Sequence, residues 1–400
     1  MPAAGPSGHL RFLLGEAAGS LGDLGTFLPI TVGLVQIVGM DAGAVLLWTG
    51  LVCIGTGLVF RTPMAVQPMK AIGALAIAGF LTADQVGLAG ITVGVCMLAV
   101  GTTPLARWLD RFLPKAVLRG LQLAVALQLV RSGVLLGLFH GAVGALRPAW
   151  GPDGLVVVGA AAVLLLVLHR RLELAALLLV LAALVGAAVS RPGLLADTGL
   201  SLWRPHWVPF ALHSLTGVWN GGLAQVPLTL VNSVFSVSVL AGQLFPAQKG
   251  RNTPARFATS VGLINLIVCP LGGMPLCHGA GGLAAQHRLG GRTGLTTVLR
   301  GMVLLALGLF FGKTTLAWLQ AFPASILGIF LVIAGFGLAE ASRCWTSVSV
   351  LLVAVVVVVA YLATGLLLVG LVAGWAAHLL LGARQPIRRA VGLVAEGIDE

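Results

Sequence analysis

The chain has 400 residues, of which 58% are hydrophobic and only 9% are charged, and its mean hydropathy is +1.03. Because soluble domains carry about 25% charged residues, this composition excludes an ordinary soluble protein and predicts an all-α polytopic membrane protein. A net charge of +12 would suggest nucleic acid as the partner of a soluble protein. In a membrane protein it reflects cytoplasmic loops, where Lys and Arg collect, so the expected partner is the lipid bilayer and not nucleic acid.

The N-terminus and the cysteines add two expected absences. Met1–Ser20 has no basic region followed by an apolar core and a cleavage site, so we expect no signal peptide. The cysteines are scattered through apolar runs, where a thiol behaves as a small buried hydrophobe; they are Cys53, Cys96, Cys269, Cys277 and Cys344. Their spacing predicts neither a disulfide framework nor a metal site, and we expect no cofactor.

Long apolar segments follow one another along the whole chain. Seven precede a polar stretch that contains three prolines, at 19–40, 43–60, 64–81, 86–106, 116–138, 154–169 and 172–190. Seven more follow it, at 212–240, 257–271, 275–290, 294–312, 318–340, 345–361 and 363–382. Since a full span takes about 20 residues, we predict fourteen transmembrane segments joined by short loops.

The basic residues give this arrangement an orientation. If both termini are cytoplasmic and the sides alternate, most of the 24 Lys and Arg residues, including Arg300, fall on the cytoplasmic side. Because seven is odd, the second half enters the membrane from the opposite side, which predicts inverted repeats. The predicted units are a first repeat at 1–191, a connecting loop at 192–211, a second repeat at 212–383 and a cytoplasmic tail at 384–400.

The third and tenth segments do not have the sequence of continuous helices. Pro63–Ala76 begins with Pro63 and Pro68, which fit poorly inside a helix, and becomes a good helix former from Lys70. Gly272–Gly282 has a similar extended Met-Pro start followed by small residues. Paired broken segments in the two halves of a transporter mark its binding site. We therefore predict two half-helices whose N-terminal ends meet at the membrane midplane.

An anion suits such a meeting of helix ends. Helix N-termini expose N–H groups and carry the positive end of the helix dipole. Lys70 adds a charge that is costly in lipid and functional by default; the alternative is that Lys70 only pairs with a carboxylate such as Asp23.

Polar residues also recur in the first segment of each half. Asp23 lies among glycines in the first, and Gln225, Thr229 and Asn232 fall on one helical face in the eighth. Such a polar stripe either lines a transport path or joins helices, and its recurrence in the first segment of each half favours a transport path.

Four motifs resemble the signatures of the molybdate transporter family, a branch of the sulfate permease superfamily. They are Gly-Asp-Leu-Gly-Thr-Phe-Leu-Pro at 22–29, Pro-Met-Ala-Val-Gln-Pro-Met-Lys at 63–70, Gln-Val-Pro-Leu-Thr-Leu-Val-Asn-Ser at 225–233 and Gly-Met-Pro-Leu-Cys-His-Gly-Ala-Gly-Gly-Leu-Ala at 273–284. The resemblance implies seven-plus-seven inverted repeats, a core domain, a gate domain and uptake of an oxyanion. The second motif has Ala65 where proline is expected, which should loosen the extended segment slightly without removing Gln67 or Lys70.

The residues and the resemblance together predict a substrate site between the two half-helix starts. The expected substrate-binding residues are Thr26, Phe27, Gln67, Met69, Lys70, Ala71, Gln225, Thr229, Asn232, Cys277, His278, Gly279, Ala280 and Gly281. The candidates for proton coupling are Glu16, Asp23 and His278. For Glu16 a position at the membrane interface is the alternative, and for His278 a satisfied core histidine.

We expect a secondary active transporter of the cell (inner) membrane that imports molybdate, with proton symport as the default hypothesis. Sulfate, a tetrahedral dianion of similar shape, is the alternative substrate, and a passive anion channel is the alternative mechanism. The sequence has no nucleophile–base constellation, so we expect no enzyme, and no Gly-x-x-x-x-Gly-Lys-Ser/Thr motif, so we expect no use of ATP. The oligomeric state is open between a monomer and a homodimer.

Overall fold

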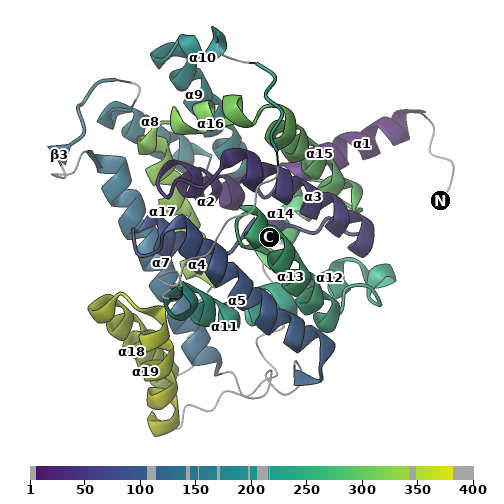
Figure 1. Cartoon of the computed structure of the whole chain (residues 1–400), viewed down its shortest axis with the longest axis vertical. Helices are drawn as coiled ribbons and strands as arrows, with labels where there is room; N and C mark the ends of the chain where they lie inside the picture. Colours follow the sequence, from purple (N-terminus) through teal and green to yellow (C-terminus); the bar gives the residue numbers. More distant parts are fainter. Residues whose placement is uncertain are drawn as a thin grey trace.

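The computed structural model describes residues 6–105, 114–140, 145–151, 153–168, 172–196, 199–204, 215, 217–341 and 348–381. The described chain is mostly helical, as predicted (Figure 1). Its first half contains α1 (Pro6–Ser20), α2 (Leu24–Gln36), α3 (Ala42–Phe60), β1 (Val66–Pro68), α4 (Lys70–Ile77), α5 (Ala83–Thr102), α7 (Lys115–Leu138), β2 (Phe139–His140), β3 (Ala145–Leu146), α8 (Leu155–Val167), α9 (Leu172–Ser190) and α10 (Gly193–Ala196).

The second half begins with a helix in which α-helical and π-helical turns alternate. Its elements are a π-helical turn at Val218–Gly222, α11 (Leu223–Thr229), a π-helical turn at Leu230–Phe235 and α12 (Ser236–Leu244). There follow a short 3₁₀ turn at Pro246–Gln248, α13 (Pro254–Val268), a 3₁₀ turn at Cys269–Leu271, β4 (Leu276–His278), α14 (Ala280–Arg288), α15 (Leu295–Phe310), α16 (Gly312–Gln320), α17 (Ala324–Ala341), α18 (Val348–Thr364) and α19 (Leu367–Leu381).

Each predicted apolar segment overlaps at least one of these helices. By length and composition alone, five described helices are long and apolar enough to cross a membrane, or six if the bent pair α16–α17 counts as one span. The multi-pass character agrees with the prediction, whereas the number of fourteen spans stays a prediction. The predicted tail at 384–400 lies outside the described residues.

Two predicted segments have interruptions that the sequence pattern does not predict. A turn at Leu21–Asp23 separates α1 from α2, so the segment at 19–40 is not one helix. The segment at 318–340 is also divided, because α16 and α17 meet at an angle of 87°. The break falls at Phe322 and Pro323. Proline lacks an N–H and disfavours helical geometry in the preceding residue, which explains the bend.

Helices of the two halves pack against each other through glycines. α3 packs against α15, α5 against α13 and α7 against α17. A methyl group added at Gly50 of α3 would lie 2.7 Å from the carbonyl oxygen of Gly301 in α15. One added at Gly328 of α17 would lie 2.5 Å from the carbonyl oxygen of Gly133 in α7. Small residues let helix backbones approach closely, so these three pairs join the halves by direct backbone contact.

The two broken segments meet in an antiparallel strand pair at the centre of the molecule. β1 pairs with β4 in the register Val66–His278, Gln67–Cys277 and Pro68–Leu276. Two further hydrogen bonds extend the pair symmetrically: the Met69 N–H donates to the Pro275 carbonyl at 2.9 Å, and the Gly279 N–H donates to the Ala65 carbonyl at 3.3 Å. The predicted extended segments are therefore present, and they bind each other.

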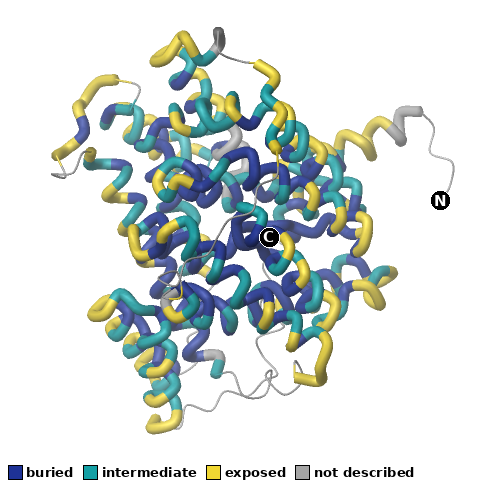
Figure 2. Tube along the Cα trace, in the orientation of Figure 1, coloured by how far each residue is buried: buried dark blue, intermediate teal, exposed yellow. Residues whose placement is uncertain are grey.

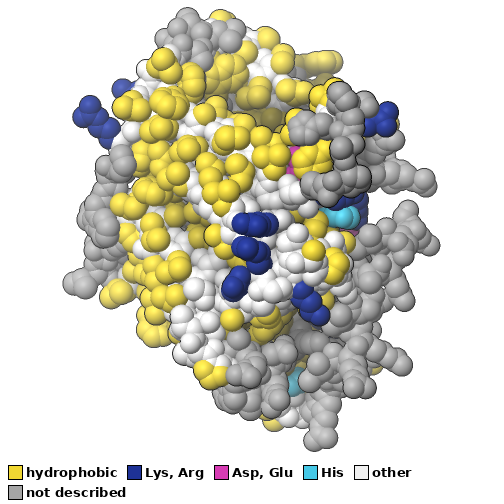
Figure 3. Space-filling view, turned by 90° about the vertical axis from the view of Figure 1, so that its right-hand side faces the viewer, with side chains coloured by type: hydrophobic (Ala, Val, Ile, Leu, Met, Phe, Trp, Pro, Cys, Tyr) yellow, Lys and Arg dark blue, Asp and Glu magenta, His cyan; other side chains and the backbone are white. Residues whose placement is uncertain are grey.

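The surface is as apolar as the composition predicts. Buried residues concentrate on the inner helices and exposed ones on the outer helices and turns (Figure 2). On the face in Figure 3, apolar side chains cover most of the described surface, and Lys and Arg side chains gather in a few places. Large exposed apolar patches on a soluble protein would cause association, so this surface fits contact with lipid.

The described part of the predicted connecting loop ties α3 to the junction of α15 and α16. The Ser201 N–H donates to the Phe310 carbonyl at 2.8 Å, and the Trp203 N–H to the Leu309 carbonyl at 2.8 Å. The Trp203 indole N–H donates to Asp41 Oδ2 at 3.0 Å. Since Asp41 also caps the first turn of α3 by accepting from the Ala44 N–H, the loop is anchored at both helices.

Candidate anion-binding site

The candidate site lies where β1 and β4 end and α4 and α14 begin. The first N–H groups of a helix have no partner inside it. In the described part of the chain, no hydrogen bond is formed by the N–H groups of Ile72, Ala280 and Gly281, whereas the Ala71 N–H donates to Gln225 Oε1 at 3.0 Å. Two helix ends with free donors are therefore held together by the strand pair.

The polar residues of α11 and the turn after it serve different neighbours. Gln225 is buried and accepts from α4, while its Nε2 donates to Thr229 Oγ1 at 3.0 Å. Asn232 accepts instead from Gln122 Nε2 of α7 at 2.8 Å. The π-helical turn at Leu230–Phe235 changes the direction of side chains relative to a regular helix. Gln225 thus reaches the start of α4 and is supported by Thr229, whereas Asn232 joins α7.

Asp23 stands at the centre of a buried polar network. Its Oδ2 forms an ion pair with Arg300 Nη1 of α15 at 2.9 Å, and its Oδ1 accepts from Gln67 Nε2 of β1. The Arg300 guanidinium also lies over the Phe27 ring, 4.3 Å from its centroid. Asp23, Gln67 and Arg300 are all buried. This network connects α2, β1 and α15 directly behind the strand pair.

The position of Arg300 differs from the one that the distribution of basic residues predicts. The alternation of sides predicts it among the cytoplasmic basic residues, but it is buried beside Asp23. The signal is present in the sequence, because Arg300 is the one charged residue between Leu295 and Phe310. A charge within an apolar span needs a partner or a polar cavity, and Asp23 is that partner.

Lys70 is half-buried at the first position of α4. In the described part of the chain no carboxylate lies within ion-pair distance of its ammonium group. Its positive charge acts on Asp23 and on Cys277 at longer range. The alternative in which Lys70 serves only as the ion-pair partner of Asp23 is wrong, because Arg300 takes that place.

Three glycines after β4 show where the start of α14 is closely packed and where it is open. A Cβ at Gly279 would collide with the Gln67 amide, and one at Gly282 would lie 2.5 Å from Gln67 Nε2 and 2.6 Å from Asp23 Oδ1. At Gly281, by contrast, nothing lies within 4 Å of an added Cβ. Gly281 is exposed, and Thr26 and Lys70 are half-buried. The open space therefore adjoins the start of α14, and the side chains of Gln67 and Asp23 pack closely beside it.

Cys277 and His278 point to opposite sides of β4, as successive strand residues do. The Cys277 side chain is buried. The His278 ring is fully buried between Phe60 and Phe257, with centroid distances of 5.4 and 5.5 Å. Its Nε2 lies 3.0 Å from the hydroxyl oxygen of Ser260. The structure thus places the His278 side chain in an aromatic cluster, away from the strand face that carries Gln67 and Cys277.

Glu16 has a structural environment of its own. It is fully buried near the end of α1. Its carboxylate accepts from the backbone N–H groups of Arg292, Thr293 and Thr296, each at 3.0 Å, and from the Thr296 hydroxyl at 2.6 Å. A carboxylate at a helix N-terminus stabilises the helix. Glu16 therefore holds α1 against the start of α15.

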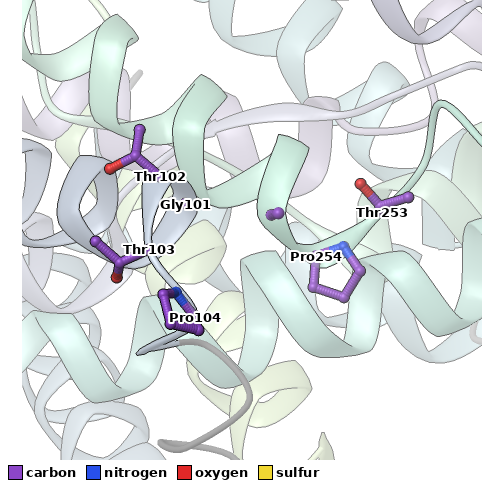
Figure 4. Close-up of a pocket in the computed structure, with 7 residues that line it drawn as sticks. Gly101, Thr102, Thr103, Pro104, Thr253 and Pro254 are labelled. Atoms are coloured by element: carbon purple, nitrogen blue, oxygen red, sulfur yellow. The ribbon is translucent and has the colours of Figure 1, made fainter.

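A separate pocket is formed by residues other than those of the candidate site. It has a volume of about 500 Å³ and is lined by residues at the end of α5 and the start of α13, including Thr102, Thr103, Thr253 and Pro254 (Figure 4). It contains none of the predicted substrate-binding residues. Among the described residues no group of three His, Cys, Asp or Glu side chains could hold a metal ion.

The family model described as "Molybdate transporter of MFS superfamily" matches residues 15–129 and 217–338. Molybdate transporter 1 of Chlamydomonas reinhardtii is 35% identical to this chain, over 82% of the chain and 83% of the relative. Molybdate transporter 2 of Arabidopsis thaliana is 33% identical, over 83% of the chain and 79% of the relative.

Solved structures give the fold. The transmembrane domain of the cyanobacterial bicarbonate transporter BicA aligns with a TM-score of 0.64 at 18% identity, covering 92% of this chain and 98% of that domain. The structure of SLC26A9 aligns with a TM-score of 0.63 at 13% identity, covering 94% of this chain and 65% of that chain. The chain thus shares the fold of these two solved structures, and the matching sequences show that it belongs to the molybdate transporter family.

Proposed function

We propose that the chain is a secondary active transporter that imports molybdate and binds it between the starts of α4 and α14. The observation that carries the proposal is the β1–β4 pair, which brings together two helix N-termini with free N–H donors. Lys70 begins one of these helices, and open space adjoins Gly281 in the first turn of the other. Relatives that are 33–35% identical are named as molybdate transporters. The proposed contacts are the N–H groups of Ile72, Ala280 and Gly281, with Thr26 and Lys70 at the rim.

The charges around this space match a dianion. Lys70 and Arg300 contribute two positive charges and Asp23 one negative charge, which leaves a net charge of one. Each helix N-terminus adds about half a positive charge, so the two ends together supply about one more. The total of about +2 balances MoO₄²⁻ without any further side chain.

The same network offers a physical basis for proton coupling. Protonation of Asp23 would remove its negative charge and leave Arg300 without a counter-ion. The site would then attract an anion more strongly, and by linkage a bound anion would favour protonation of Asp23 to the same extent. We propose Asp23 as the coupling residue. Glu16 and His278 already have hydrogen-bond partners away from the open space.

Alternating access is favoured over a passive channel by the way the halves pack. In the proposed repeats α3 corresponds to α13, and α5 corresponds to α15. Exchanging the two halves then converts the contact between α3 and α15 into the contact between α13 and α5, and the structure contains both contacts. β1–β4 maps onto itself in the same way. This symmetry supports the proposed inverted repeats, in which one group of helices rocks against another around a fixed site.

The test is uptake of labelled molybdate into proteoliposomes, with sulfate, tungstate and phosphate as competitors. We expect uptake of labelled molybdate to be saturable and to be driven by an inward proton gradient. Unlabelled molybdate and tungstate should both inhibit it by competition. Stronger competition by sulfate than by unlabelled molybdate would make sulfate the substrate. Large, non-saturating flux independent of any gradient would identify a channel.

The family and its solved neighbours are transporters, and the apolar helices place the chain in a membrane. We propose the cell (inner) membrane with both termini cytoplasmic. In that orientation α14 ends on the cytoplasmic side, where Arg288 and Arg292 are exposed.

A further inference from the structure

Behind the strand pair, several buried polar atoms have no partner in the described part of the chain. They are Nε and Nη2 of Arg300, and both amide atoms, Nε2 and Oε1, of Gln286. Gln286 is fully buried and Arg300 is 5% exposed. The Thr62 hydroxyl is also buried without a partner. None of these atoms is a proposed contact of the anion, although the charge of Arg300 contributes to the charge balance of the site.

Helix geometry directs the Gln286 side chain toward the Asp23–Arg300 pair. Gln286 lies one turn along α14 from Gly282, on the same face, and Gly282 turns that face to Asp23, 2.6 Å from an added Cβ. Side chains in a helix lean back toward its N-terminus, which directs the Gln286 amide toward Asp23. The preceding residue of the α1–α2 turn, Gly22, packs directly on the Gln286 backbone.

Unpartnered buried donors and acceptors are normally satisfied by ordered water. A dry site would leave a guanidinium edge and a whole amide desolvated, which is unfavourable. Arg300 supplies donors, and Gln286 supplies one donor site and one acceptor. Two water molecules between them would give each of these atoms a partner.

We propose that Gln286 and the free edge of Arg300 hold ordered water that carries protons between Asp23 and the end of α14. This inference rests on the proposed proton coupling. The route continues along α15, because Thr296 lies one turn before Arg300 on the same face and donates to Glu16 at 2.6 Å. Arg292 lies before the first residue of α15, is exposed and donates its backbone N–H to the same Glu16 carboxylate, so this polar layer borders the surface there.

The decisive variant is Gln286→Leu, which keeps the size of the side chain and removes both hydrogen-bonding groups. Gln243→Leu, at an exposed position of α12, is the matched control. We expect Gln286→Leu to bind molybdate within twofold of the parent in calorimetry at fixed pH, while proton-driven uptake and the accompanying proton flux fall at least tenfold. Gln286→Asn, which keeps the amide, should retain at least half of the parental uptake.

X-ray radiolytic footprinting reports the water independently of transport. Bound water should label the Phe27 ring despite its burial, because that ring packs under Arg300, and Gln286→Leu should lower this labelling at least threefold. Unchanged labelling together with unchanged proton-driven uptake in Gln286→Leu would overturn the inference, as would an equal loss of binding and uptake. If the parent itself ignores the proton gradient, the proposed coupling fails, and the labelling still decides whether the water is present.

Discussion

Breaking the Asp23–Arg300 ion pair should destabilise the protein strongly. Two unit charges 2.9 Å apart attract each other by about 6 kcal/mol at an effective dielectric constant of 20, and much of this offsets their desolvation. Removing one partner of a buried pair leaves the other charge uncompensated, which costs about 3–5 kcal/mol. Globular proteins gain about 2.1 cal/mol/K of entropy per residue on unfolding. For 400 residues the melting temperature should therefore fall by about 4–6 °C.

The assay is thermal unfolding of purified protein in detergent for Arg300→Met, Asp23→Asn and the double variant. In the double variant no unpaired charge remains, and the amide oxygen of the introduced asparagine can still accept from Gln67, so at least half of the loss should be recovered. Arg61→Met, at an exposed arginine, controls for loss of charge alone. Additive effects of the two single substitutions, or a loss in Arg300→Met no larger than in the control, would refute the proposed pairing.

Three further predictions concern the site and the packing. Lys70→Gln should weaken molybdate binding more than tenfold in calorimetry at fixed pH, because it removes one of the charges that balance the dianion; parental affinity would show that Lys70 does not face the anion. Gly282→Ala should lower the melting temperature, because the methyl group meets the Gln67 amide at 2.5 Å, whereas Gly281→Ala should not, since its space is open; equal effects would contradict this geometry. Gly328→Ala should separate α7 from α17 and reduce folded yield in size-exclusion chromatography, in contrast to Gly159→Ala, which meets nothing within 4 Å.

The sequence predicts the architecture of the site well where local chemistry decides it. Pro63, Pro68 and Pro275 prevent regular helix at the start of both broken segments, and small residues favour helix after them. The strands β1 and β4 and the starts of α4 and α14 follow from these preferences. The side-by-side pairing of the two strands could be expected from the symmetry of two halves, although not its register.

Long-range pairing accounts for what the sequence does not predict. Asp23 and Arg300 are 277 residues apart in the chain, and no local pattern specifies which charge a buried arginine meets. The sequence predicts His278 at the substrate because it is the titratable residue of the second broken segment, yet strand alternation sends its side chain to the face opposite Cys277. Glu16 is a coupling candidate on charge alone, while its partners at the start of α15 depend on how α1 folds back.

The β1–β4 pair also constrains biosynthesis. Its two strands are separated by about 200 residues, which a ribosome takes about 10–40 s to synthesise at about 5–20 residues per second. Throughout that interval the backbone groups of β1 have no strand to bind, and in a bilayer each unsatisfied group costs several kcal/mol. A nascent chain that stops before Leu276 therefore exposes a defect at its centre that cellular quality control can detect, and the proposed anion site is complete only once translation has passed Gly281.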